Sequence, residues 1–277
     1  MIKKKYNPRF DVPQLNSAAK DLVRKIGVSL SPLTTICVAS CNPQKLILRV
    51  REGFCIPEGC PVACIPRHHF LNASVLGDSP HALLLPTQEE ISTALGSKHM
   101  GIEQHVLLAL YVASQLCLED FAADPLKRWF QMQCRMVQPN EQTVKEFKPI
   151  WFDLSEHFTV PSFPAFVSAM QYVLSAALLA NREESPSIPV KDTDLAGTPD
   201  VLPGHTLCLA PVIDLALHRD EQRTNTKLVF VDHKAMCDVY RSGPLYGVHH
   251  MIARGDSDFA VLLASSPIRG VNPVTLC

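Results

Sequence analysis

The stretch "LCLAPVIDLALHRDEQRTN", residues 207–225, contains the features that decide the fold. Its apolar run continues through Pro211 to Asp214, His218 follows, and the chain then becomes strongly polar. A short apolar run bounded in this way is typical of a buried strand that leads into a loop. The stretch therefore fits three interpretations: an active site, the remains of one, or a plain strand and loop.

Strand-like runs lie on both sides of this stretch and again near the start of the chain. Over residues 36–66, the runs "TTICVAS", "KLILRV" and "CPVACIP" are separated by turn residues, which predicts three short strands. After residue 205, the runs "TLCLAPVIDL", "TKLVFVD", "GVHHMIA" and "DFAVLLAS" predict further strands. Between the two groups, "RHHFLNASVLG" predicts a helical turn or two.

A helical block separates the two groups of strands. Residues 102–120 carry apolar side chains at helical spacing, which predicts a core helix. Residues 125–136 predict a second helix, opened by Pro125, whose missing N–H is harmless in a first turn. Residues 163–182 predict a third helix. Residues 183–205 hold four prolines and two glycines, which predicts a long surface loop.

The order of these elements predicts an α+β fold in which short β-strands are interrupted by a helical insert. We expect four regions along the chain. They are a basic N-terminal arm with a short helix (1–30), the N-terminal part of the β-rich domain (31–76), the helical insert with its proline-rich loop (77–205), and the C-terminal part of the β-rich domain (206–277).

Several phrases resemble the SET-domain methyltransferases, in the branch that includes Rubisco large-subunit methyltransferase. "FCIPEGCPVACIPRHHFLNASVL" is similar to the strand pair and short helix of that family, and "APVIDLALHRDEQRTN" to its Pro-Leu-x-Asp-x-x-Asn-His segment. "FPAFVSAMQYVLSAAL" resembles the helix before that segment, and Trp129 occupies the matching position of a Trp-containing insert helix. The resemblance covers about residues 36–272 and implies a SET-like fold.

The same comparison shows departures where the family binds S-adenosylmethionine. A Gly-x-Gly lets the family's backbone approach that cofactor, but this chain has Ile47, Leu48, Arg49 and Val50. The family's Asn is replaced by Leu217, whereas Asp214 and His218 are kept. The resemblance thus makes Arg49, Val50, Asp214, Leu217 and His218 candidates for a remnant pocket, and we expect no bound cofactor.

The tyrosine that orients the target amine in the family is also missing from its expected place. The alignment puts Ser265 and Ser266 where Tyr-Gly should stand. Tyr246, followed by Gly247, is the alternative catalytic tyrosine, although the strand before it is then too short. Both Asp214 and His218 also have structural interpretations, as the cap of a turn and as a hydrogen-bonded buried imidazole.

Composition limits the partners. Lys and Arg number 26 against 27 Asp and Glu, so there is no overall basic surface for nucleic acid. Lys3, Lys4, Lys5 and Arg9 could lie on RNA phosphates or on an acidic protein, or form a solvated terminus. The ten cysteines lie mostly in apolar runs and suggest buried thiols in a reducing compartment. Neither they nor the paired histidines predict a metal site.

These observations favour a catalytically degenerate SET-like protein that is a structural or binding subunit of a large assembly. Partner proteins, and RNA at the basic arm, would be its contacts. A mitochondrial ribosome is the setting we expect, because the Lys-rich, acid-poor start is compatible with a presequence; a cytoplasmic location is the other. No apolar run is long enough for membrane insertion. The alternative is an active S-adenosylmethionine-dependent protein-lysine or protein-histidine methyltransferase with a divergent pocket.

Overall fold

The computed structural model describes residues 12–39, 42–66, 69, 71–72, 76, 85–99, 101–117, 124–137, 139–181, 205–218, 224–243, 245, 258–270 and 272–276. Its elements are, in chain order, α1 (Val12–Ile26), β1 (Ser29–Leu30), β2 (Thr34–Ala39), β3 (Asn42–Val50), β4 (Cys55–Ile56), β5 (Pro61–Pro66), β6 (Leu71–Asn72), α3 (Gln88–Leu95), η3 (Gly96–His99), α4 (Glu103–Cys117), α5 (Pro125–Met136), α6 (Glu141–His157), α7 (Phe163–Ala176), β7 (Leu178–Asn181), β8 (His205–Leu209), η4 (Ile213–Leu215), β9 (Leu217–His218), β10 (Thr226–Asp232), α8 (His233–Ser242), β11 (Asp258–Ala264), β12 (Ile268–Arg269) and β13 (Thr275–Leu276).

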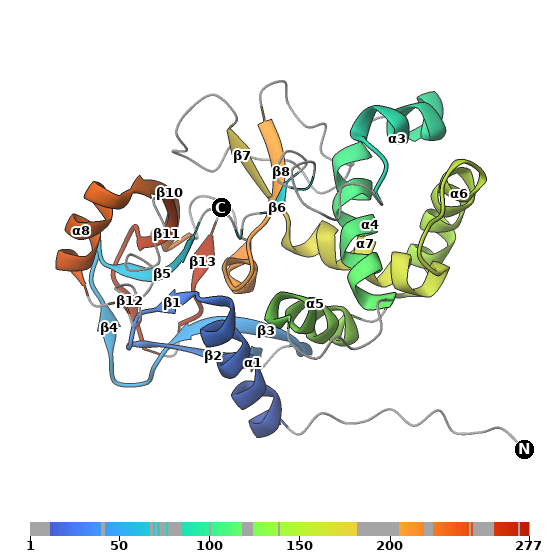
Figure 1. The fold of residues 1–277 in the computed structure, drawn as a ribbon. Coiled ribbons are helices and arrows are strands. Elements are labelled where there is room, and N and C mark those ends of the chain that lie inside the picture. The colour runs from blue at the N-terminus through green and yellow to red at the C-terminus, as the bar shows by residue number, and fades with distance from the viewer. Residues whose placement is uncertain are drawn as a thin grey trace, which may run out of the picture.

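The largest sheet and most of the helical insert lie at opposite sides of the molecule, with α8 on the side of the sheet. Figure 1 shows the strands β5, β10, β11 and β13 at the left and the helices α3, α4, α6 and α7 at the right. The three-stranded sheet β6-β8-β7 lies between them, and the β2-β3 hairpin runs along the bottom beside α5. The expected α+β fold, in which helices interrupt short strands, is confirmed.

The largest sheet joins early and late parts of the chain. Its order is β1-β5-β11-β10-β13-β9, so strand β5 from the N-terminal part pairs directly with β11 from the C-terminal part. The pairing of β10 with β11 runs antiparallel from Thr226 opposite Ala264 to Asp232 opposite Asp258. Val261 and Phe259 on β11 are fully buried. This sheet therefore supplies a rigid platform for the segments that lie beside it.

Strand β13 has an unusual place in that sheet, between β10 and β9 and parallel to both. Just before it, the Val274 N–H donates to the Leu48 carbonyl at 2.9 Å, and the Val50 N–H donates to the Asn272 carbonyl at 3.3 Å. Residues 272–276 therefore connect β3 to the strands of the C-terminal part.

The helices expected from residues 102–120 and 125–136 are confirmed as α4 and α5. Helix α5 begins where the sequence indicates, because the Asp124 side chain caps it by accepting from the Leu126 N–H at 2.9 Å. Pro125 stands in its first turn. The apolar core of the helical part includes Trp129, Phe130 and Phe166, which are fully buried.

Two local expectations were wrong, and one helix was missed. The helix expected over residues 163–182 ends at Ala176, because residues 178–181 form β7 and pair with β8 instead. Residues 71–72, placed in a helical turn by the sequence pattern, form β6 and also pair with β8. Helix α6 was not predicted at all, and it continues through Pro149.

The described residues test the remaining expectations about the fold only in part. The described cysteines are free; Cys64, Cys134 and Cys208 are buried as expected, but Cys55 and Cys117 are exposed. Residues 183–204 of the proline-rich loop and residues 247–253 of the strand "GVHHMIA" lie outside the described residues. Among the helices of the described ranges, we find none that is both long and apolar enough to cross a membrane.

Candidate functional site

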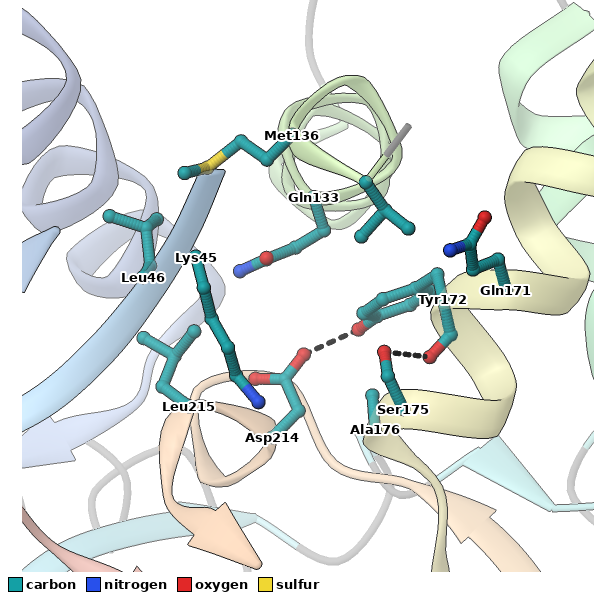
Figure 2. Close-up of a pocket in the computed structure, with 11 residues that line it drawn as sticks. Lys45, Leu46, Gln133, Met136, Gln171, Tyr172, Ser175, Ala176, Asp214 and Leu215 are labelled. Carbon is teal, nitrogen blue, oxygen red and sulfur yellow. Dashed lines mark hydrogen bonds between the residues drawn. The ribbon is translucent and has the colours of Figure 1, made fainter. Parts of the chain in front are cut away.

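A pocket of about 290 Å³ opens where the β2-β3 hairpin meets the helical part. Figure 2 shows its walls, which come from β3, α5, α7 and η4. Tyr172 lines the pocket together with five other polar or charged residues: Lys45, Gln133, Gln171, Ser175 and Asp214. The apolar lining consists of Leu46, Met136, Val137, Ala176 and Leu215.

Asp214 reaches this pocket from the short helix η4, in the middle of the stretch that decides the fold. The preceding Val212 has φ +76°, a left-handed conformation that β-branched residues rarely adopt. The turn is closed by the Asp214 N–H, which donates to the Ala210 carbonyl at 2.9 Å, and by the Leu215 N–H, which donates to the Val212 carbonyl at 3.0 Å. Strained backbone of this kind persists where surrounding contacts enforce it, often at functional sites.

Two aromatic side chains hold one oxygen of Asp214. The Trp129 indole N–H donates to Asp214 Oδ2 at 3.2 Å, and the Tyr172 hydroxyl donates to the same oxygen. The carboxylate is only 5% exposed. Its other oxygen, Oδ1, is buried and has no hydrogen-bond partner among the described residues. Because a buried acceptor without a partner is costly, this oxygen is poised to accept a donor from a ligand or a water.

Burial decides the protonation states of Asp214 and Tyr172. It raises the pKa of Asp214 from 3.8 to about 6, against the opposing effects of the Tyr172 and Trp129 hydrogen bonds and of the Lys45 charge. Burial, followed by the nearby Asp214 charge, raises the pKa of Tyr172 well above its ordinary value. At pH 7 Asp214 is therefore mainly ionised and Tyr172 is protonated.

Two donors line the same pocket. Lys45 extends from β3 toward Asp214 (Figure 2). The Gln133 side chain projects from α5 into the pocket, and its buried Nε2 has no hydrogen-bond partner among the described residues. The pocket therefore combines an ammonium group, an amide donor and a carboxylate acceptor, which suits a polar ligand that carries both charges.

Of the five candidates for a remnant pocket, Asp214 lines this pocket and the others lie elsewhere. Arg49 and Val50 are further along β3, where Arg49 forms a backbone bridge with Pro273 and Val50 is buried at 1% exposure. Residues 217–218 form β9, with Leu217 opposite Thr275 and His218 opposite Leu276.

The remaining candidates divide into two groups. Lys3, Lys4, Lys5, Arg9 and the alternative tyrosine Tyr246 lie outside the described residues. Ser265 and Ser266 follow the end of β11, where the Ser265 N–H donates to the Asn225 carbonyl at 2.9 Å.

Sequence reasoning missed Lys45, Gln133 and Tyr172. Trp129 was singled out by the resemblance, but its contact with Asp214 joins residues 85 positions apart. A usable signal did exist in α7, because a tyrosine on the apolar face of a helix needs a partner for its hydroxyl when buried. Nothing in the sequence identifies Asp214 as that partner.

Comparison with known proteins gives the fold its class. No family model matches the chain, and no curated protein matches it in sequence. Among solved structures, the SET domain of LSMT bound to lysine and AdoHcy matches with a TM-score of 0.57 at 12% identity, over 96% of this chain and 54% of that one. The SET domain of LSMT bound to methyl-lysine and AdoHcy matches with a TM-score of 0.55 at 11% identity, over 95% of this chain and 52% of that one.

The chain thus has a SET-like fold, as the resemblance implied, and spans about half the length of the solved structures that it matches. The expectation that no cofactor belongs to this fold is contradicted, because both of these matched structures contain AdoHcy. That expectation was argued from residues 47–50, which do not line the described pocket. The pocket in the structure is lined instead by Lys45 and Leu46 on the same strand.

Proposed function

We propose that the protein binds S-adenosylmethionine and acts as a protein N-methyltransferase of the SET class. The observation that carries the proposal is the buried carboxylate of Asp214, which faces a polar pocket within a SET-like fold. The matched SET domains of LSMT hold AdoHcy together with lysine or methyl-lysine, which supports an amine as the methyl acceptor. A lysine or histidine side chain of a protein is the substrate class.

The pocket fits part of such a cofactor. Drug-sized ligands occupy pockets of about 300–1,000 Å³, so about 290 Å³ is enough for one end of S-adenosylmethionine. The unpartnered Asp214 Oδ1 would accept from a cationic group, and Gln133 Nε2 would donate to an anionic one. When bound, S-adenosylmethionine would supply an electrophilic methyl group.

The protein's own residues would bind and orient rather than move protons. Trp129 and Tyr172 fix one oxygen of Asp214, which leaves the other directed to the ligand with little rotational freedom. Tyr172 is not suited to act as a base, because burial raises its pKa well above the ordinary value. The ionised Asp214 stabilises a nearby positive charge in a site of low dielectric.

Titration calorimetry tests the proposal. Wild-type protein should give saturable heat with S-adenosylmethionine and with AdoHcy, and Asp214→Ala should weaken binding by about tenfold or more. Asp153→Asn, which changes a partly exposed carboxylate on α6, is the control and should bind as the wild type does. Mass spectrometry of protein substrates incubated with methyl-labelled S-adenosylmethionine then reports transfer. Absence of saturable heat with both compounds would contradict the proposal.

A second candidate is a binding subunit of a large assembly, and it is favoured by Ser265 and Ser266. These residues directly follow β11, where the resemblance places the family's catalytic tyrosine. Cofactor binding without methyl transfer, together with co-purification in a defined complex such as a mitochondrial ribonucleoprotein, would select this candidate.

A further inference from the structure

Lys45 occupies an irregular part of its hairpin. Val38 on β2 pairs with Leu46, but the next residue, Ala39, pairs with Asn42, so residues 43–45 of β3 form a bulge. Bulges occur next to functional sites, where they redirect a side chain out of the regular alternation. Here the bulge ends at Lys45, whose side chain extends into the pocket toward Asp214 (Figure 2).

The two charges arise from segments that are far apart in sequence. Lys45 comes from β3 and Asp214 from η4, both line the pocket, and the ammonium group lies beside the carboxylate (Figure 2). An ammonium group has three donors, so an interaction with Asp214 leaves others for a ligand. Asp214 Oδ1 and Gln133 Nε2, both buried and lining the same space, add an acceptor and a donor without partners among the described residues.

This arrangement is complementary to the charged end of an α-amino acid. A free carboxylate would take hydrogen bonds from Lys45 and Gln133, and the adjacent ammonium group would donate to Asp214 Oδ1. A pocket meant only for a cation would not need a lysine among its walls, because the like charge disfavours the ligand.

We propose that Lys45 is a specificity-determining residue that binds the carboxylate of an α-amino-acid ligand, opposite Asp214, which binds the ligand's ammonium group. The inference rests on the proposed function, and the methionine end of S-adenosylmethionine is the ligand that it concerns. Lys45 thereby selects ligands that keep their carboxylate.

The experiment compares S-adenosylmethionine with decarboxylated S-adenosylmethionine, which lacks only that carboxylate, by titration calorimetry. Wild-type protein should bind the carboxylated compound about 10- to 100-fold more tightly, since a hydrogen bond to a charged group is lost in the other. Lys45→Met keeps the length of the side chain and should abolish the preference. Lys45→Arg keeps the charge and should restore most of it.

A matched control is Lys148→Met, which removes a lysine on α6 that lies over the Phe152 ring, 5.8 Å from its centroid. This variant should keep the wild-type preference. Equal binding of the two compounds by wild-type protein, or a preference that survives in Lys45→Met, would overturn the role of Lys45 and leave the proposed function intact. No binding of either compound would overturn both. Equal binding by the wild-type protein would overturn the proposal without any variant, so it remains refutable even if Lys45→Met fails to fold.

Discussion

Replacement of Asp214 by asparagine should change how stability depends on pH. In the folded protein, burial raises the pKa of Asp214 from 3.8 to about 6, so protonation favours the folded state. The stabilisation is complete below pH 3.8 and is lost as the pH rises through about 6. Asparagine is neutral throughout and has a similar shape. The free energy of unfolding of Asp214→Asn, relative to wild type, should therefore increase with pH.

The size of this increase follows from the two pKa values. At about 1.4 kcal/mol per pH unit, the difference between 3.8 and about 6 corresponds to about 3 kcal/mol, most of it gained between about pH 4 and 7. Urea denaturation of both proteins at several pH values in this range measures it. Groups that titrate alike in both proteins cancel in the difference.

The control is Glu52→Gln, because Glu52 is exposed in the turn after β3. A surface change of this kind should alter the free energy of unfolding by less than about 0.5 kcal/mol at any of these pH values. A relative stability of Asp214→Asn that stays constant, or falls as the pH rises, would refute the reasoning. It would mean that the ionised carboxylate is favoured in the folded protein and that burial does not dominate.

Three further changes test contacts around the site and the core. Trp129→Phe removes one of the two donors to Asp214 and should lower the free energy of unfolding at pH 7 by about 2–3 kcal/mol. A decrease of less than about 0.5 kcal/mol, measured by urea denaturation, would contradict a contribution of that hydrogen bond. Burial lowers the pKa of His105, so the contribution of His105 to stability is lost as the pH drops below about 6.5. Relative to wild type, His105→Leu should therefore gain stability as the pH falls from 7 to 5 in thermal melts, and a constant difference between the two proteins would count against it. Asn225→Ala removes an acceptor 2.8 Å from the Thr275 N–H and should cost about 1–3 kcal/mol and speed hydrogen exchange at that amide; unchanged exchange would contradict this.

Much of the fold could be predicted from the sequence because its strands and helices carry strong local signals. Helix α5 is a clear case, since the capping Asp124 and Pro125 mark its start and its apolar spacing marks its buried face. Where local signals were ambiguous, tertiary pairing decided. Residues 178–181 continue the apolar sequence of α7, but their backbone pairs with β8, so they form a strand.

The site was less predictable, because it depends on contacts across the whole chain. Asp214 stood out as a polar residue at the end of an apolar run, and it does line the pocket. Lys45 carried no such mark, since a lysine at the start of an expected strand is usually solvated, and its place next to the bulge in β3 is a feature of the tertiary structure. Residues 47–50 seemed to exclude a ligand, yet their steric effect could not be located without knowing which side chains face the pocket.

Residues 272–276 bear on when the protein can become functional during synthesis. They hold β3 through Leu48 and Val50, and they separate β9 from β10 in the largest sheet. A nascent chain that has been synthesised past Asp214 still lacks β13, the strand that pairs with β9. Pairings between such distant segments form slowly. A chain released before residue 272 could still pair β5, β11 and β10, but β9 would lack β13, its partner in that sheet, and β3 would lack its backbone bonds to residues 272 and 274.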